Sequence, residues 1–121
     1  MSSSSKQNLS AVLQELKSEY LAKFPQKIQS LRELTQAQNW ECLEREYHKL
    51  KGTGKTYGFP EISTVCERME ILAHVHHLRD HQKFQDVLLL LERLHQGYAK
   101  SSPLKLEEDA FARSLLDLKS K

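Results

Sequence analysis

Residues 43–59 read LEREYHKLKGTGKTYGF, and this stretch decides how the rest of the chain is interpreted. Apolar or small residues recur in it every three or four positions, as they do along one face of an α-helix. On a helical wheel with about 100° per residue and Leu43 at zero, this face spans roughly 40° to either side. It holds Leu43, Tyr47, Leu50, Gly54 and Tyr57. The stretch therefore predicts an amphipathic helix with one face in a core.

The other side of the same helix carries His48, Lys51, Gly52 and Lys55, at roughly 80° to 180° on the wheel. A neutral imidazole is a good nucleophile and can hold a phosphoryl group, and a lysine one turn away can neutralise its oxygens. Gly52 costs about 1 kcal/mol of helix propensity relative to alanine, which suggests that something large comes close. The alternative is that these are ordinary solvated residues and that the glycines mark a helix end.

Upstream of this helix, apolar residues again follow a helical stripe. Pro25 lacks an amide hydrogen, so we expect the first helix to break or kink there and to resume as far as about Gln38. Asn39 is the expected N-cap of the helix that carries His48. The stripe before Pro25 consists of Leu9, Val12, Leu13, Leu16, Tyr20 and Phe24.

Downstream, Gly58 begins a turn that continues through Phe59 and Pro60. A fourth helical segment should follow with Ile62, Val65, Met69, Leu72 and His76 on its buried side, ending near Asp80. A fifth, from about Phe84 to Tyr98, and a short amphipathic helix within 104–118 complete the pattern. No strand pattern occurs, so the fold class is all-α.

Length and composition limit the number of domains, the partners and the compartment that we expect. With 121 residues the chain suits one domain, and its net charge of +2 gives no general drive toward nucleic acid or membrane. Two cysteines and the lack of a long apolar stretch indicate a reduced, cytoplasmic protein. We expect a disordered leader over residues 1–8, a helical bundle over 9–100, and a tail or short helix over 101–121.

The string from His48 to Phe59 resembles the signature of histidine-containing phosphotransfer (HPt) domains, with matches at His48, Lys51, Gly52 and Gly58. The resemblance covers roughly residues 9–98. It implies an antiparallel four-helix bundle, here with an N-terminal helical extension and a short C-terminal helix. It also implies a phosphorelay carrier, not an enzyme, with His48 as phospho-acceptor and Gly58 as a structural turn.

The resemblance further implies the partners: receiver domains of response regulators and of hybrid histidine kinases, which supply the aspartates and the metal ion. No cofactor or metal of the chain's own, no nucleic acid and no membrane is expected, and we expect a monomer. Lys51 and Gly52 would support the phosphate and the docking of the receiver. Lys55 departs from the family pattern, and it is either a further phosphate-supporting charge or simply solvated.

Two other functional hypotheses stay open. His74, His77 and His81 share a helical face suited to a transition metal, although histidines near a helix end also interact favourably with its dipole. The bundle could also be an adaptor that binds receivers without being phosphorylated. An autokinase is excluded, because the chain has no glycine-rich nucleotide loop in a suitable context and no room for an ATP-binding domain.

Overall fold

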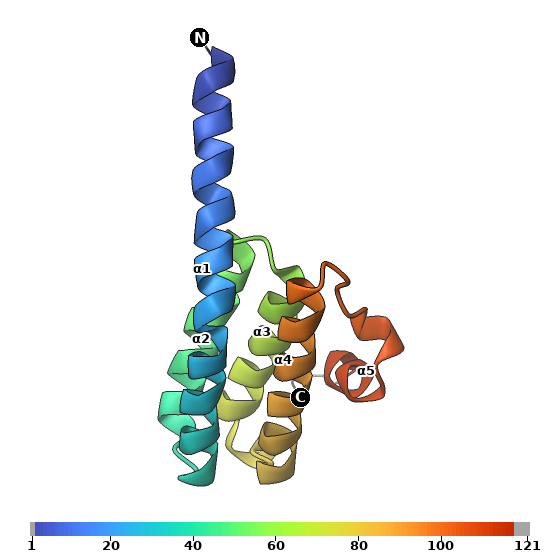
Figure 1. The fold of residues 1–121 in the computed structure, drawn as a ribbon. Helices are drawn as coiled ribbons and strands as arrows, with labels where there is room; N and C mark the ends of the chain where they lie inside the picture. The colour runs from blue at the N-terminus through green and yellow to red at the C-terminus, as the bar shows by residue number, and fades with distance from the viewer. Residues whose placement is uncertain (1, 118–121) are drawn as a thin grey trace.

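The computed structural model describes the backbone of residues 2–117 and the side chains of residues 9–117, and every described element is helical. Four long helices are followed by a short one, as Figure 1 shows. In chain order the elements are α1 (Ser2–Gln36), α2 (Trp40–Thr56), α3 (Pro60–His74), the 3₁₀ turn η1 (His76–Leu78), α4 (His81–Ala99), the 3₁₀ turn η2 (Leu106–Glu108) and α5 (Ala110–Asp117). The predicted all-α class is confirmed.

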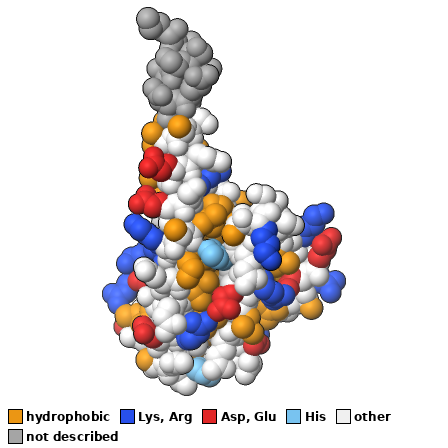
Figure 2. Space-filling model, in the orientation of Figure 1, with side chains coloured by type: hydrophobic (Ala, Val, Ile, Leu, Met, Phe, Trp, Pro, Cys, Tyr) orange, Lys and Arg blue, Asp and Glu red, His pale blue; other side chains and the backbone are white. Residues whose placement is uncertain are grey.

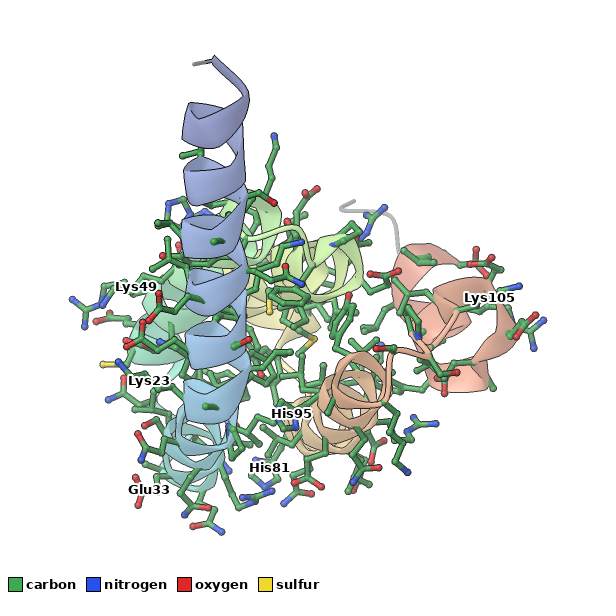
Figure 3. The ribbon with its side chains drawn as sticks, turned by 45° about the horizontal axis from the view of Figure 1, so that its top comes forward. Lys23, Glu33, Lys49, His81, His95 and Lys105 are labelled. Atoms are coloured by element: carbon green, nitrogen blue, oxygen red, sulfur yellow. The ribbon has the colours of Figure 1, made fainter. Side chains whose placement is uncertain are left out.

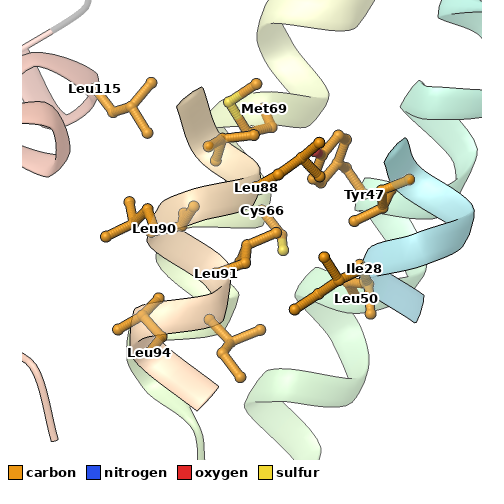
Figure 4. Packing of buried hydrophobic residues seen from close by; sticks show 14 of the residues in the cluster. Ile28, Tyr47, Leu50, Cys66, Met69, Leu88, Leu90, Leu91, Leu94 and Leu115 are labelled. Atoms are coloured by element: carbon orange, nitrogen blue, oxygen red, sulfur yellow. The ribbon is translucent and has the colours of Figure 1, made fainter. Parts of the chain in front are cut away.

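The helices pack as a bundle around one apolar core. α2 lies along α3, and α1 lies between α2 and α4 (Figure 1). Figure 4 shows Tyr47 and Leu50 of α2 facing Cys66 and Met69 of α3 and the leucines of α4. Asn39 caps α2 as predicted, because its side chain accepts a hydrogen bond from the Cys42 amide at 3.3 Å.

α1 continues through Pro25, so the predicted break of the helix is wrong, while a kink there stays a prediction. A proline within a helix leaves the carbonyl of the fourth preceding residue without its amide donor, and here that carbonyl belongs to Leu21. His95 of α4 replaces the donor, with its Nε2 2.7 Å from the Leu21 oxygen. The His95 ring also stacks on Phe24, and Figure 3 shows it between α1 and α4. A neighbouring helix thus supplies the hydrogen bond that proline removes.

The N-terminal part of α1 stands clear of the bundle (Figure 1). The apolar stripe predicted for this helix is buried only from Tyr20 onward, and its earlier members are exposed. The backbone of α1 begins at Ser2, within the segment predicted as a disordered leader. The side chains of residues 1–8 lie outside the described residues, and disorder of this leader stays a prediction.

α3 ends at His74, earlier than the predicted end near Asp80. The chain leaves the helix at Val75, and His76, which the sequence placed on the buried stripe, is exposed. Asp80 instead caps α4, where its side chain accepts hydrogen bonds from the amides of Gln82 and Lys83. None of the described helices is long and apolar enough to cross a bilayer.

The C-terminal segment docks on α3 and α4. A Cβ on Gly97 would lie 2.8 Å from the Ser102 carbonyl oxygen, so glycine allows the chain to fold back over α4. Asp109 accepts a hydrogen bond from the Ala112 amide and forms an ion pair with Arg93 of α4. Leu115 is buried against the bundle, while Leu118, also assigned to this helix by the sequence, lies outside the described residues.

We predict that His95→Phe lowers the free energy of unfolding by about 1 kcal/mol, because phenylalanine keeps the ring but cannot donate to the Leu21 carbonyl. The same substitution should cost little in a Pro25→Ala background, where residue 25 regains an amide hydrogen. Urea unfolding of the four proteins measures both costs. Equal costs in the two backgrounds would contradict the compensation.

Candidate functional site

The helix α2 presents the two faces that its sequence predicts. Leu43, Tyr47, Leu50 and Gly54 are buried. His48 lies between them in sequence but on the outward side, and 64% of its side chain is exposed. The imidazole is therefore held on a rigid helix and remains open to an approaching protein.

A carboxylate of α3, from Glu70, faces this histidine. His48 Nδ1 lies 2.6 Å from Glu70 Oε2, and Lys51 Nζ donates to Glu70 Oε1 at 2.8 Å. One carboxylate thus binds the two residues that the sequence singled out. The sequence did not single out Glu70, although its position carries a signal. Residues 48 and 70 are equally far along the chain from Phe59 in the turn between the helices. Two antiparallel helices joined by this turn therefore place the two residues side by side.

The contact with Glu70 determines which imidazole nitrogen can react. A carboxylate is only an acceptor, so a neutral His48 keeps its proton on Nδ1 and leaves the lone pair of Nε2 free. That lone pair can attack phosphorus, and the imidazolium that then forms is stabilised by the adjacent carboxylate. The geometry supports nucleophilic chemistry at Nε2.

The charges of Lys51 and Glu70 stabilise each other. Burial alone would raise the pKa of Glu70, but the hydrogen bonds from Lys51 and His48 lower it below its usual value. The hydrogen bond to Glu70 raises the pKa of Lys51. Glu70 therefore stays ionised and Lys51 protonated throughout the neutral range. The pairing is lost when acid protonates the carboxylate or when base deprotonates the lysine.

The glycines near His48 have different environments. A Cβ added to Gly52 would meet no described atom within 4 Å, apart from its own helix, so this surface is open. A Cβ on Gly54 would lie 3.0 Å from the Ser63 amide nitrogen, because α2 and α3 approach closely there. Gly58 has a φ of 81° in the turn before α3, a conformation that suits glycine.

The site also includes a second, unengaged lysine. Lys55 lies one turn beyond Lys51, is exposed, and has no described ion pair. Ser63 ties the same region of the two helices together, because its hydroxyl donates to the Lys51 carbonyl oxygen at 2.9 Å. The backbone of Lys51 is thus tied to α3 and its ammonium group contacts Glu70, whereas the side chain of Lys55 is exposed.

The structure does not support a transition-metal site in the histidine-rich segment. His74 lies in α3, with its Nδ1 3.1 Å from Glu44 Oε2, whereas His81 begins α4 beyond the intervening turn. Within the described part of the chain, no group of three or more histidine, cysteine, aspartate or glutamate side chains is placed to hold a metal ion. The shared face with His77 depended on a helix that continued to Asp80, and α3 ends at His74.

Comparison with known protein families gives a match. The family model described as Hpt domain matches residues 15–97, which cover α1 from Glu15, α2, α3 and nearly all of α4. No curated protein and no solved structure matches the chain. The C-terminal segment with η2 and α5 lies outside the matched range.

We predict that neutral His48 is protonated on Nδ1 in the wild type, because Glu70 accepts that proton. In Glu70→Ala the preference should be lost, while the free energy of unfolding changes by about 1 kcal/mol or less, since the pair lies at the surface. Long-range ¹H–¹⁵N NMR spectra distinguish the two tautomers. A wild-type His48 protonated on Nε2 would contradict the assignment.

Proposed function

The chain belongs to the Hpt domain family, and from that membership we propose that His48 accepts a phosphoryl group from a receiver-domain aspartate and passes it to the aspartate of another receiver. Members of this family are carriers in two-component signalling that work with receiver domains, and they are not catalysts themselves. The observation that carries the proposal is the exposed His48 imidazole with Glu70 at its Nδ1.

In the proposed step, the Nε2 lone pair of His48 attacks the phosphorus of an aspartyl phosphate. The N–P bond forms as the bond between phosphorus and the aspartate oxygen breaks, and the aspartate leaves as a carboxylate. The Nδ1 proton remains on the ring, where Glu70 stabilises the positive charge. Transfer to a second receiver is the reverse of this step, and the receiver supplies the metal ion.

Lys51 and Lys55 have different parts in this proposal. Lys51 lies one turn from His48 and can turn from Glu70 toward the phosphoryl oxygens when these arrive. Lys55 has no described ion pair and adds positive charge on the side of the approaching receiver. Gly52 leaves space for the receiver to reach Nε2 in line.

We also propose the arrangement of the helices and the cellular location of the protein. We assign α1–α4 to an antiparallel four-helix bundle of the HPt type, supported by the short connections at residues 37–39 and 57–59. α1 provides an N-terminal extension, and α5 a short C-terminal helix. We place the protein in the cytoplasm, which is consistent with the two free thiols, Cys42 and Cys66.

We predict that a phosphorylated receiver labels the wild type and that His48→Gln reduces labelling at least about 100-fold, since glutamine offers no imidazole nucleophile. His74→Gln is the matched control, because His74 is also exposed and also lies beside a carboxylate, Glu44. It should leave labelling unchanged. Continued labelling of His48→Gln would overturn the assignment, as would loss of labelling in His74→Gln.

We predict that Gly52→Gln slows transfer about 10-fold or more while the free energy of unfolding stays equal or rises by up to about 1 kcal/mol. The added side chain enters open space but stands where a receiver must approach. Gly54→Ala should instead lower the free energy of unfolding, because its Cβ would press on the backbone of α3. Urea unfolding and transfer kinetics separate the effects. Normal transfer by Gly52→Gln would place the docking surface elsewhere.

A further inference from the structure

Two hollows open along the seam between α1 and α2. One, of about 210 Å³, has Tyr20 and Thr53 in its lining, and the other, of about 260 Å³, has Glu46. Lys23 and Lys27 of α1 line both. The hollows therefore adjoin at these two lysines, and we call the combined space the α1–α2 groove. Figure 2 shows Lys and Arg side chains gathered along this edge of the bundle, to the left of α1.

The groove carries more positive than negative charge. Of its two lining carboxylates, Glu19 pairs with Lys23 at 3.6 Å. The other, Glu46, pairs with Lys49 at 3.4 Å, and Figure 3 shows Lys49 and Lys23 projecting on the same side of α1. Lys27 is exposed and has no described ion pair. Such solvent-exposed pairs are weak, so the lysines can turn toward an anion that enters the groove.

Two hydroxyl groups add neutral donors beside the lysines. The Thr53 hydroxyl donates to the Tyr20 oxygen at 3.2 Å, across the seam between the helices. Burial raises the pKa of Tyr20, so its hydroxyl stays protonated at neutral pH. A phenol that accepts one hydrogen bond can still donate its own proton. An oxyanion in the groove can therefore meet both ammonium and hydroxyl donors.

One part of the groove is apolar. Leu16, which is 39% exposed, and the half-buried Tyr57 line the smaller hollow. The Tyr57 ring centre lies 5.3 Å from that of Tyr20, so the two rings form an aromatic wall. Apolar walls with a few polar groups that fix orientation are typical of small-molecule sites. A ligand that fits this groove has an apolar body and an anionic head.

We propose that the α1–α2 groove binds a small organic phosphate, with its phosphoryl oxygens between Lys23 and Lys27 and its apolar body against Leu16 and Tyr57. Lysine binds phosphate as a point charge, whereas a planar carboxylate is best matched by the paired donors of arginine. No arginine is in the described lining of the groove. The three terminal oxygens of a phosphate monoester can also use more of the available donors than a carboxylate can.

The groove is separate from the site proposed for phosphoryl transfer. Thr53 lies five residues after His48, which places it about 140° further around α2. A ligand in the groove therefore leaves the imidazole exposed. It would contact α1 and α2 together, so its binding should stabilise the bundle by mass action. The binding does not depend on transfer at His48, and either proposal can fail without the other.

The affinity should be low. Lys23 and Lys27 are exposed, and exposed charges gain little from pairing against water and salt. For phenyl phosphate we expect a dissociation constant on the order of 1 mM. Inorganic phosphate has no apolar body, so its dissociation constant should be at least several-fold higher.

An NMR titration of the ¹⁵N-labelled full chain, without receiver or metal ion, tests the site. Phenyl phosphate should shift the amide signals of Tyr20, Lys23 and Thr53 along a saturating curve. Lys23→Gln combined with Lys27→Gln should raise the dissociation constant about 10-fold or more, because both charges are removed. Lys83→Gln is the matched control, since Lys83 lies on α4 and outside the groove. It should bind as the wild type does.

Two further comparisons test the chemistry of the ligand. Leu16→Ser should weaken phenyl phosphate several-fold and leave inorganic phosphate unchanged, and benzoate should bind more weakly than phenyl phosphate at the same ionic strength. Equal binding of benzoate would overturn the preference for phosphate. Unchanged affinity in the double lysine variant would overturn the site, as would signals that shift first around His48 and Lys51.

Discussion

The close packing of α2 against α3 sets the geometry around His48. Gly54 permits this approach, since any side chain there would meet the Ser63 backbone, and Ser63 in turn binds the Lys51 carbonyl oxygen. With the two helices in this register, Glu70 comes level with His48 and Lys51. A wider spacing or a shift by one residue would remove the carboxylate from the imidazole. The reactive nitrogen is thus selected by helix packing.

Other parts of the fold hold this hairpin in place. α1 and α4 close the core on the side away from His48, and their contact includes the His95 hydrogen bond that lets α1 continue through Pro25. The C-terminal segment, as far as it is described, packs on α3 and α4. The open surface around Gly52 and Lys55 therefore remains free for a partner, while the N-terminal part of α1 offers a separate apolar surface.

The sequence predicted best those features, such as burial and exposure, that depend on a single helix. The periodicity of α2 placed Tyr47 and Leu50 in the core and His48 outside it, because both facts depend only on position along one helix. It predicted less well where two helices meet. Glu70 was missed because pairing depends on register between helices, and the continuity of α1 at Pro25 depends on His95 far along the chain. The exposure of Leu9 was likewise hidden, since a periodic stripe does not reveal where its partner ends.

The central claim is that Nε2 of His48 carries the phosphoryl group, and NMR of the phosphorylated chain tests it most directly. After phosphorylation by a receiver, ³¹P and ¹⁵N spectra of selectively labelled histidine identify both the residue and the ring nitrogen. We expect a single phosphohistidine, at Nε2 of residue 48, whose signal disappears when an unphosphorylated receiver and its metal ion are added. A phosphoryl group on Nδ1, or on another histidine, would contradict it.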